Sequence, residues 1–230
     1  MNIYWKIFKY IFAFIGENNI RAIKLLILNN FAWMGLSNSV QRLDQAIINF
    51  FEKKKGLIFL EVGAADGLDQ SNSLLLERKY GWSGYLIESN PHLFNQCRKS
   101  RKDVVVESYA LVSEEISNLT REVSLSNNQL QSKVIFDKNS LENTKNSNVN
   151  AKTITLDKFI EHHDIKTIDV FILDVEGNEI NVLEGYTGDK NIIKYLVVET
   201  WDYDLFHVYA KQRGWSFIKK LGKWDYLYKL

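Results

Sequence analysis

The sequence of 230 residues contains one cysteine, one proline and almost no net charge. Cys97 has no partner for an intramolecular disulfide and no zinc-type cysteine cluster around it, so a reducing, cytoplasmic setting is expected. Pro91 is the single proline, so prolines mark no linker between domains. Because 29 Lys and Arg balance 28 Asp and Glu, we expect no bulk attraction to nucleic acid.

The N-terminal part contains no run that could cross a membrane. Residues 5–15 are apolar and aromatic, but a transmembrane helix needs about 20 such residues. Lys6 and Lys9 interrupt this run and no small-residue cleavage site follows, so a signal sequence is not indicated. Isoleucines at helical spacing predict a helical extension over residues 1–52. Two interpretations stay open: the helices pack on the main domain or on a partner subunit of a homo-oligomer, or residues 1–30 lie peripherally on the inner membrane face.

Residues 53–230 carry an alternation of apolar strands and helices that predicts one domain of α/β class. The predicted strands are 57–62, 85–88, 104–106, 170–174 and 195–199, followed by a hairpin of 215–221 with 224–230 around Gly222. The predicted helices are 71–80, 91–101, 156–162 and 179–184. Strands that alternate with helices and end in a hairpin indicate a mostly parallel sheet covered on both faces. The asparagine-rich segment at about 114–150 is predicted to be a polar insertion, with a short hairpin around Val134–Phe136, that serves as a lid or is a plain surface excursion.

Two acidic strand ends are the most informative feature of the chain. The strand over 57–62 includes Glu61 and runs into a small-residue loop with Gly63 and Gly67. About one strand–helix–strand unit later, the next strand ends in Glu88. Glycines allow close approach of the backbone to a ligand, and a strand-end carboxylate can bind a ribose diol. These features predict a nucleoside-bearing cofactor.

The loop does not match the phosphate-binding patterns of other cofactors. Gly63 and Gly67 are spaced G-x-x-x-G, which is not the G-x-G-x-x-G fingerprint of nicotinamide enzymes, so an oxidoreductase is disfavoured. No Gly-Lys-Ser/Thr occurs, which excludes a P-loop. The acidic residue before the loop favours a ligand with a positive centre and no phosphate. S-adenosylmethionine (SAM), with a cationic sulfonium and a ribose diol, is such a ligand.

The motifs and their order resemble those of the FkbM-type SAM-dependent methyltransferases. The resemblance runs from about Gly56 to Trp201 and is carried by EVGAADG at 61–67, SN at 71–72, GW at 81–82, IESNP at 87–91 and LDVEGNE at 173–179. It implies a class I methyltransferase-like (Rossmann-like) fold, a mostly parallel seven-stranded sheet completed by the antiparallel C-terminal hairpin. It also implies transfer of a methyl group from SAM to oxygen, often on sugars or other small hydroxylated molecules. The cofactor-binding residues expected on this basis are Glu61, Gly63, Ala64, Ala65, Asp66, Gly67, Ser71, Asn72, Glu88, Ser89, Tyr109, Ala110 and Asp174.

Carboxylates at the carboxyl ends of the later strands are the candidates for catalysis, because ligands of open α/β sheets bind at that edge. Asp174 is expected at the methionine end of SAM or at the acceptor hydroxyl, with Glu176 as the alternative base or as a cap of the helix that begins near Asn178. Glu199 ends the neighbouring strand and is interpreted either as part of the acceptor site or as a carboxylate facing water. His207 is a further candidate base, with a packed helix residue as the alternative.

The function predicted from the sequence is a SAM-dependent O-methyltransferase that acts on a hydroxyl of a saccharide, glycoconjugate or other small molecule. The alternative is a catalytically idle relative that serves as a binding or membrane-associated scaffold. Ala65, Ser89 and Ile172 depart from the usual family pattern, and Ala65 and Ile172 are the reason for this alternative. The sequence shows no compact cluster of histidines and carboxylates, so no metal site is predicted.

Overall fold

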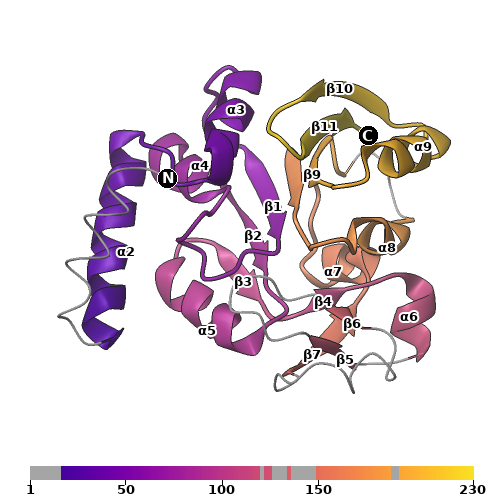
Figure 1. The fold of residues 1–230 in the computed structure, drawn as a ribbon, viewed down its shortest axis with the longest axis horizontal. Helices are drawn as coiled ribbons and strands as arrows, with labels where there is room; N and C mark the ends of the chain where they lie inside the picture. Colours follow the sequence, from indigo (N-terminus) through magenta and orange to yellow (C-terminus); the bar gives the residue numbers. More distant parts are fainter. Residues whose placement is uncertain (1–16, 120–121, 126–133, 136–148, 188–191) are drawn as a thin grey trace.

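The computed structural model describes residues 17–119, 122–125, 134–135, 149–187 and 192–230. A seven-stranded sheet forms its centre, with the order β10-β11-β9-β8-β1-β2-β3 (Figure 1). Its strands are β1 (Ile58–Val62), β2 (Ser83–Ile87), β3 (Val105–Glu107), β8 (Val170–Leu173), β9 (Tyr195–Glu199), β10 (Ser216–Lys220) and β11 (Asp225–Lys229). In this order, the five neighbouring strands β9, β8, β1, β2 and β3 are parallel, whereas β11 is antiparallel to both β9 and β10. The predicted mostly parallel sheet with an antiparallel C-terminal hairpin is confirmed.

Three helices cover one face of this sheet. They are α7 (Leu156–His162), α8 (Glu179–Glu184) and α9 (Tyr203–Gln212). Their apolar side chains, including Phe159, Leu183 and Phe206, form one buried cluster with alternate residues of the strands, among them Leu60 and Val62 of β1. A strand presents successive side chains to opposite faces, so this face receives only every second residue of β1.

The other face carries α3 (Leu43–Phe50), α4 (Leu74–Tyr80) and α5 (Pro91–Ser100). The N-terminal helix α2 (Glu17–Met34) lies outside α4, and a short 3-10 helix (Val40–Arg42) precedes α3 (Figure 1). Leu28 and Ala32 of α2 are buried in the cluster of this face, so α2 packs on the main domain, as one of the two interpretations proposed. The predicted apolar stretch 5–15 lies outside the described residues. None of the described helices is long and apolar enough to span a membrane.

Capping residues explain where the helices next to the glycine loop begin and end. Asn90 caps α5, because its Oδ1 accepts hydrogen bonds from the backbone N–H groups of His92 (2.9 Å) and Leu93 (3.4 Å). Pro91 occupies the first turn, where its missing N–H costs nothing. α4 begins at Leu74 and not at Ser71 as predicted, because Ser71 Oγ accepts from Leu74 N (3.2 Å) and holds residues 71–73 outside the helix.

A second, smaller sheet is built from the region of the predicted insertion. Its order is β4-β7-β5-β6, formed by β4 (Ala110–Leu111), β5 (Glu122–Leu125), β6 (Val134–Ile135) and β7 (Val149–Ile154). The helix α6 (Glu114–Leu119) follows β4. β6 lies within the predicted hairpin and pairs antiparallel with β5, whereas Phe136 is outside the described residues. β4 directly follows β3 in the chain and pairs with β7. The small sheet therefore begins at Ala110, directly after Tyr109, and both residues are predicted to bind the cofactor.

Candidate functional site

The loop after β1 approaches the end of β8 so closely that only glycine fits at its first position. Gly63 has a φ of +88°, and a Cβ built on it would lie 1.8 Å from the backbone oxygen of Asp174. The side chain of Asp174 therefore starts next to this loop. Ala65 also has a positive φ, of 49°, and its backbone N–H points toward Glu88 at the end of β2.

Glu88 follows the end of β2 and is held by backbone donors from the two neighbouring loops. Ala65 N donates to its Oε2 (2.8 Å) and Asn90 N donates to its Oε1 (2.7 Å). The residue is 5% exposed. Burial raises the pKa of the Glu88 carboxyl to about 7, and the backbone hydrogen bonds only partly oppose this. A buried carboxylate fixed in this way can accept hydrogen bonds from a ribose diol.

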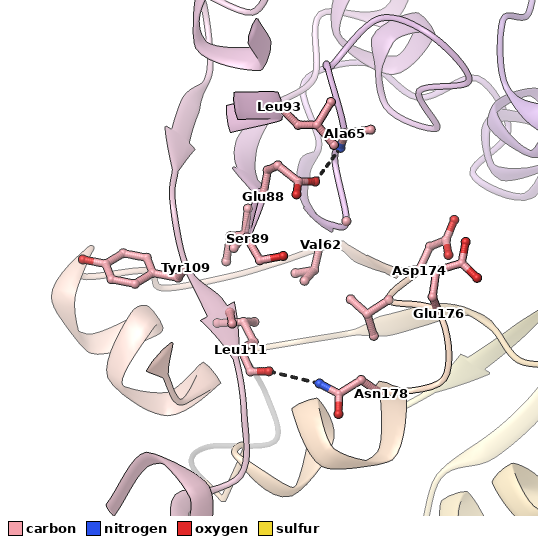
Figure 2. A pocket seen from close by; sticks show the side chains of 14 residues that line it. Val62, Ala65, Glu88, Ser89, Leu93, Tyr109, Leu111, Asp174, Glu176 and Asn178 are labelled. Atoms are coloured by element: carbon pink, nitrogen blue, oxygen red, sulfur yellow. Dashed lines mark hydrogen bonds between the residues drawn. The ribbon is translucent and has the colours of Figure 1, made fainter. Parts of the chain in front are cut away.

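A first cavity lies between the ends of β1, β2 and β8 and the start of the small sheet (Figure 2). Eight of the residues predicted from the sequence line it: Gly63, Ala65, Glu88, Ser89, Tyr109, Ala110, Asp174 and Glu176. Figure 2 shows the carboxyl groups of Asp174 and Glu176 side by side at one end, with Glu88 across the cavity. The ring of Tyr109 extends away from Glu88 at the opposite edge. The cavity thus offers a carboxylate that can accept from a ribose and uncrowded backbone at Gly63, and both features fit the adenosyl part of SAM.

Six other predicted cofactor residues do not line this cavity: Glu61, Ala64, Asp66, Gly67, Ser71 and Asn72. The Glu61 side chain points beneath the loop, where it accepts hydrogen bonds from Ser73 Oγ and from Asn72 N (3.0 Å). Burial raises the pKa of the Glu61 carboxyl, and the charge of Arg101 opposes this rise. Asp66 Oδ1 accepts from the backbone of its own turn, at Leu68 N (2.9 Å) and Asp69 N (2.8 Å).

Arg101, which sequence reasoning missed, fixes the loop from below. It is 1% exposed, and its Nε donates to Glu77 Oε2 (2.5 Å). Its Nη1 donates to the backbone oxygen of Gly67 (3.0 Å) and to Ser71 Oγ (3.0 Å), while Nη2 donates to Ser73 Oγ (2.9 Å). One guanidinium therefore ties the start of α4 and the glycine loop to the end of α5. No sequence motif identifies such a contact, because it joins residues 24 to 34 positions apart.

A second cavity of about 190 Å³ adjoins the first, with Asp174 and Glu176 in the wall of both. This volume is several times the roughly 30 Å³ that one water occupies in the liquid, so a small molecule fits. Glu199, at the end of β9, lines it together with Trp201 and Phe206. β8 and β9 are neighbours and pair in register up to Leu173 and Val198, so Asp174 and Glu199 come next to each other.

Asp174 and Glu199 form a carboxyl pair at this junction. Burial raises the pKa of Asp174 well above its usual range, and the charge of Glu199 and a hydrogen bond between the two side chains raise it further. Two carboxylates in contact cannot both be ionised cheaply, so Asp174 keeps its proton to a higher pH than an isolated carboxyl does. A pair of this kind, beside both cavities, can take up the proton of an acceptor hydroxyl.

His207 is not brought to either cavity. Its ring stacks on Tyr203 at a centroid distance of 5.3 Å, and its Nδ1 lies 3.4 Å from the hydroxyl oxygen of Tyr228. The structure therefore assigns it to the aromatic packing between α9 and β11, the alternative considered for it. Within the described ranges, no group of three or more His, Cys, Asp or Glu side chains could hold a metal ion.

Comparisons with known proteins identify the family. The model of the methyltransferase FkbM domain matches residues 61–227. Among solved structures, a human methyltransferase 10 domain containing protein is 10% identical, with 92% of this chain and 94% of that chain covered and a TM-score of 0.48. A SAM-dependent methyltransferase from Aquifex aeolicus is 14% identical (84% and 93% covered, TM-score 0.46). TrmK from M. capricolum, solved with S-adenosylhomocysteine (SAH), is 12% identical (84% and 68% covered, TM-score 0.46).

A comparison with curated protein sequences gives no match. The matched residues 61–227 include the glycine loop, Glu88, the Asp174–Glu199 pair and most of the C-terminal hairpin. The strand order and the antiparallel hairpin agree with the class I fold expected from the resemblance. The chain therefore belongs to the FkbM methyltransferase family and is a SAM-dependent methyltransferase.

Proposed function

We propose that this methyltransferase acts on oxygen, transferring the methyl group to a hydroxyl of a saccharide, a glycoconjugate or another small hydroxylated acceptor. The observation that carries this proposal is the position of Asp174. Its carboxyl group lines the cofactor cavity and the adjoining cavity alike. A hydroxyl in the second cavity would therefore have both the methyl donor and a proton acceptor within reach.

The residues of the first cavity fit the cofactor. Bound SAM supplies an activated methyl group on a sulfonium. Glu88 is placed to accept hydrogen bonds from the ribose, and Gly63 lets the backbone come close to the ligand. Ser89 and Ala110 border the remaining part of the cavity, where the adenine is expected. Holding donor and acceptor in line in this way can contribute roughly 7–11 kcal/mol to catalysis.

Asp174 is the group we assign as base. Bound SAM would give its methyl group to the acceptor oxygen with the sulfur as leaving group, and the hydroxyl proton would pass to Asp174. A positioned base of this kind contributes about 10²–10⁴-fold. The exposed ring of Trp201, 67% accessible at the rim of the second cavity, supports a saccharide because sugar rings present an apolar face that packs on aromatic rings.

The scaffold alternative is not favoured by the residues that suggested it. Ile172 is buried in β8 within the cluster of the α3–α5 face and lines neither cavity. Ala65 lines the first cavity, but the group it contributes is the backbone N–H that binds Glu88. Any residue able to adopt this backbone conformation would supply the same donor.

The test is methyl transfer from SAM with a labelled methyl group to a panel of saccharides and small alcohols. We expect label in a product that resists alkali, as a methyl ether does, and loss of turnover in Asp174→Asn with SAH binding retained in calorimetry. Label in an alkali-labile ester or on nitrogen, or full turnover by Asp174→Asn, would contradict the proposal. Asp204→Asn is the matched control, because Asp204 is an exposed residue of α9 that lines neither cavity.

A further inference from the structure

The second cavity has a one-sided charge. Five of the residues that line it carry a carboxyl group, and none of its described lining residues is basic. The five acidic residues are Asp174, Glu176, Glu179, Glu199 and Asp202. They come from the ends of β8 and β9 and from the starts of α8 and α9, so the negative charge surrounds the cavity.

Backbone N–H groups hold two of these carboxyls in place. Glu179 Oε1 accepts from Gly177 N (2.8 Å), and burial still raises the pKa of this carboxyl. Asp202 accepts from Leu205 N (3.0 Å) as the cap of α9. Behind Glu199, burial and the charge of Glu199 raise the pKa of Asp225 to about 6. Carboxyl groups gathered around one cavity, some buried like Glu179 and some exposed like Asp202, favour a ligand that brings a positive charge.

Apolar side chains at the rim of the second cavity limit which positively charged ligand fits there. Trp201 and Leu205 are exposed at the edge of the same cavity, so a ligand with an apolar face gains from contact there. A bare metal ion does not use such a rim, and no described group of side chains could hold one. A sugar ring with an amino substituent satisfies the rim and the carboxyls together.

We propose that the acceptor is an amino sugar, or a glycoconjugate that ends in one, with its hydroxyl at Asp174 and its ammonium group between Glu199 and Asp202. This inference rests on the proposed function, because it assigns the substrate class of the same cavity. Glu199 and Asp202 are then specificity-determining residues. Acceptors with a phosphate or diphosphate, such as sugar phosphates and nucleotide sugars, are repelled by the same carboxyls.

The ammonium group also has a consequence for the base. A positive charge beside Glu199 offsets the negative charge that raises the pKa of Asp174, so entry of the acceptor lowers the pKa of Asp174 and frees it to take up the hydroxyl proton. A neutral sugar of the same shape leaves the pair protonated. Binding and activation therefore favour the same acceptor.

The test compares sugars of one shape and different charge on the full chain saturated with SAH. The probes are D-glucose, its 2-amino and 6-amino derivatives, N-acetylglucosamine and glucose 6-phosphate, with affinities measured by calorimetry or saturation-transfer NMR. We expect at least one amino sugar to bind about tenfold or more tightly than glucose, as for hydrogen bonds to charged groups. Glu199→Gln and Asp202→Asn should each remove most of this preference. Asp204→Asn on the same helix should keep it.

Each outcome decides the inference. Equal affinities for amino and neutral sugars, tighter binding of the phosphate, no binding by any probe, or a preference unchanged in Glu199→Gln would overturn it. The proposed function is tested separately by methyl transfer. If neutral or phosphorylated sugars are O-methylated at least as fast as amino sugars, the proposed function holds and the preference for amino sugars is contradicted. Tight binding of amino sugars without methyl transfer to any sugar would leave the amino-sugar preference and remove the function, whereas methylation at nitrogen would contradict both.

Discussion

The backbone N–H of Ala65 donates a hydrogen bond of 2.8 Å to Oε2 of Glu88, and this bond joins the glycine loop after β1 to the end of β2. The other carboxyl oxygen of Glu88 accepts from Asn90 N at the start of α5. Glu88 therefore faces the cofactor cavity and at the same time holds two of its walls. Substitutions of Glu88 are therefore expected to change two properties that can be measured independently: the affinity for the cofactor and the dependence of stability on pH.

Glu88→Gln should weaken the binding of SAH by about 10–100-fold, the range expected for hydrogen bonds to a charged group. The amide cannot accept from two backbone donors and a ribose diol as a carboxylate does. Titration calorimetry measures the change. Glu107→Gln is the matched control, because Glu107 ends the neighbouring strand β3 and lines neither cavity. Equal losses in the two variants would contradict the assignment of Glu88 to the ribose.

The pKa of Glu88, raised to about 7 by burial, predicts a particular pH dependence of the apo protein. The folded state binds this proton more tightly than the unfolded state, so the stabilisation is fully present below about pH 4.5 and is lost as the pH rises through about 7. Between pH 5 and 8 the free energy of unfolding should therefore fall by about 1–3 kcal/mol more in the native protein than in Glu88→Gln. Urea unfolding at the two pH values gives this difference. Parallel pH profiles would show that Glu88 titrates normally.

Gly63→Ala should separate the ends of β1 and β8. A Cβ at this position would lie 1.8 Å from the Asp174 backbone oxygen, so the loop or the strand must move. We expect a loss of more than about 3 kcal/mol of stability, together with a loss of SAH binding. Gly56→Ala is the control, because Gly56 also has a positive φ (+68°) but has no atom within 4 Å of the added Cβ. It should cost only about 1–2 kcal/mol and leave cofactor affinity unchanged.

Arg101→Met should destabilise the protein by about 3–5 kcal/mol, because the buried carboxyl of Glu77 then loses one of its two charged partners, Arg78 being the other, and the buried acceptors at Gly67, Ser71 and Ser73 lose their donor. Arg101→Lys should recover part of this stability but less of the SAH affinity, since an ammonium cannot reproduce the planar fork to Gly67 and the two serines. Arg98→Met, an exposed position of the same helix, should change the midpoint of thermal unfolding little. An equally small shift for Arg101→Met would contradict the role of Arg101.

Glu199→Gln should shift the acid side of the pH–rate profile. Asp174 must be ionised to accept a proton, and the charge of Glu199 raises its pKa. Removing this charge lowers the pKa of Asp174, so the acid-side midpoint of kcat should move to lower pH. Asp204→Asn should leave the midpoint in place. A shift to higher pH in Glu199→Gln would exclude Asp174 as the base.

The strand ends could be predicted from the sequence because the apolar runs are short and end in acidic residues. Glu88 and Asp174 both reached the cavity as expected. Glu61 does not line the cavity, and the alternation of side chains along a strand explains this. Leu60 and Val62 face the helices α7–α9, so Glu61 faces α4 together with Phe59. Applied residue by residue, the two-residue period would have placed Glu61 beneath the loop.

Other features depend on contacts between distant segments, which a single sequence does not reveal. Arg101 looks like an ordinary basic residue at the end of a helix, and its burial becomes visible only when α4 and α5 are packed together. In the same way, the sequence left His207 as either a base or a packed helix residue, and it could not show that the ring stacks on Tyr203. The charge of the second cavity arises from four elements that meet only in the fold.

The pairing of β4 with β7 brings Ala110 and Leu111 next to Thr153 and Ile154. The excursion between these strands therefore leaves and re-enters the domain at neighbouring points. Closing a longer loop between fixed ends costs only about 0.6 kcal/mol for each doubling of its length. This part of the chain can accordingly be lengthened, shortened or exchanged in evolution and engineering while the adenine side of the cofactor cavity keeps its shape.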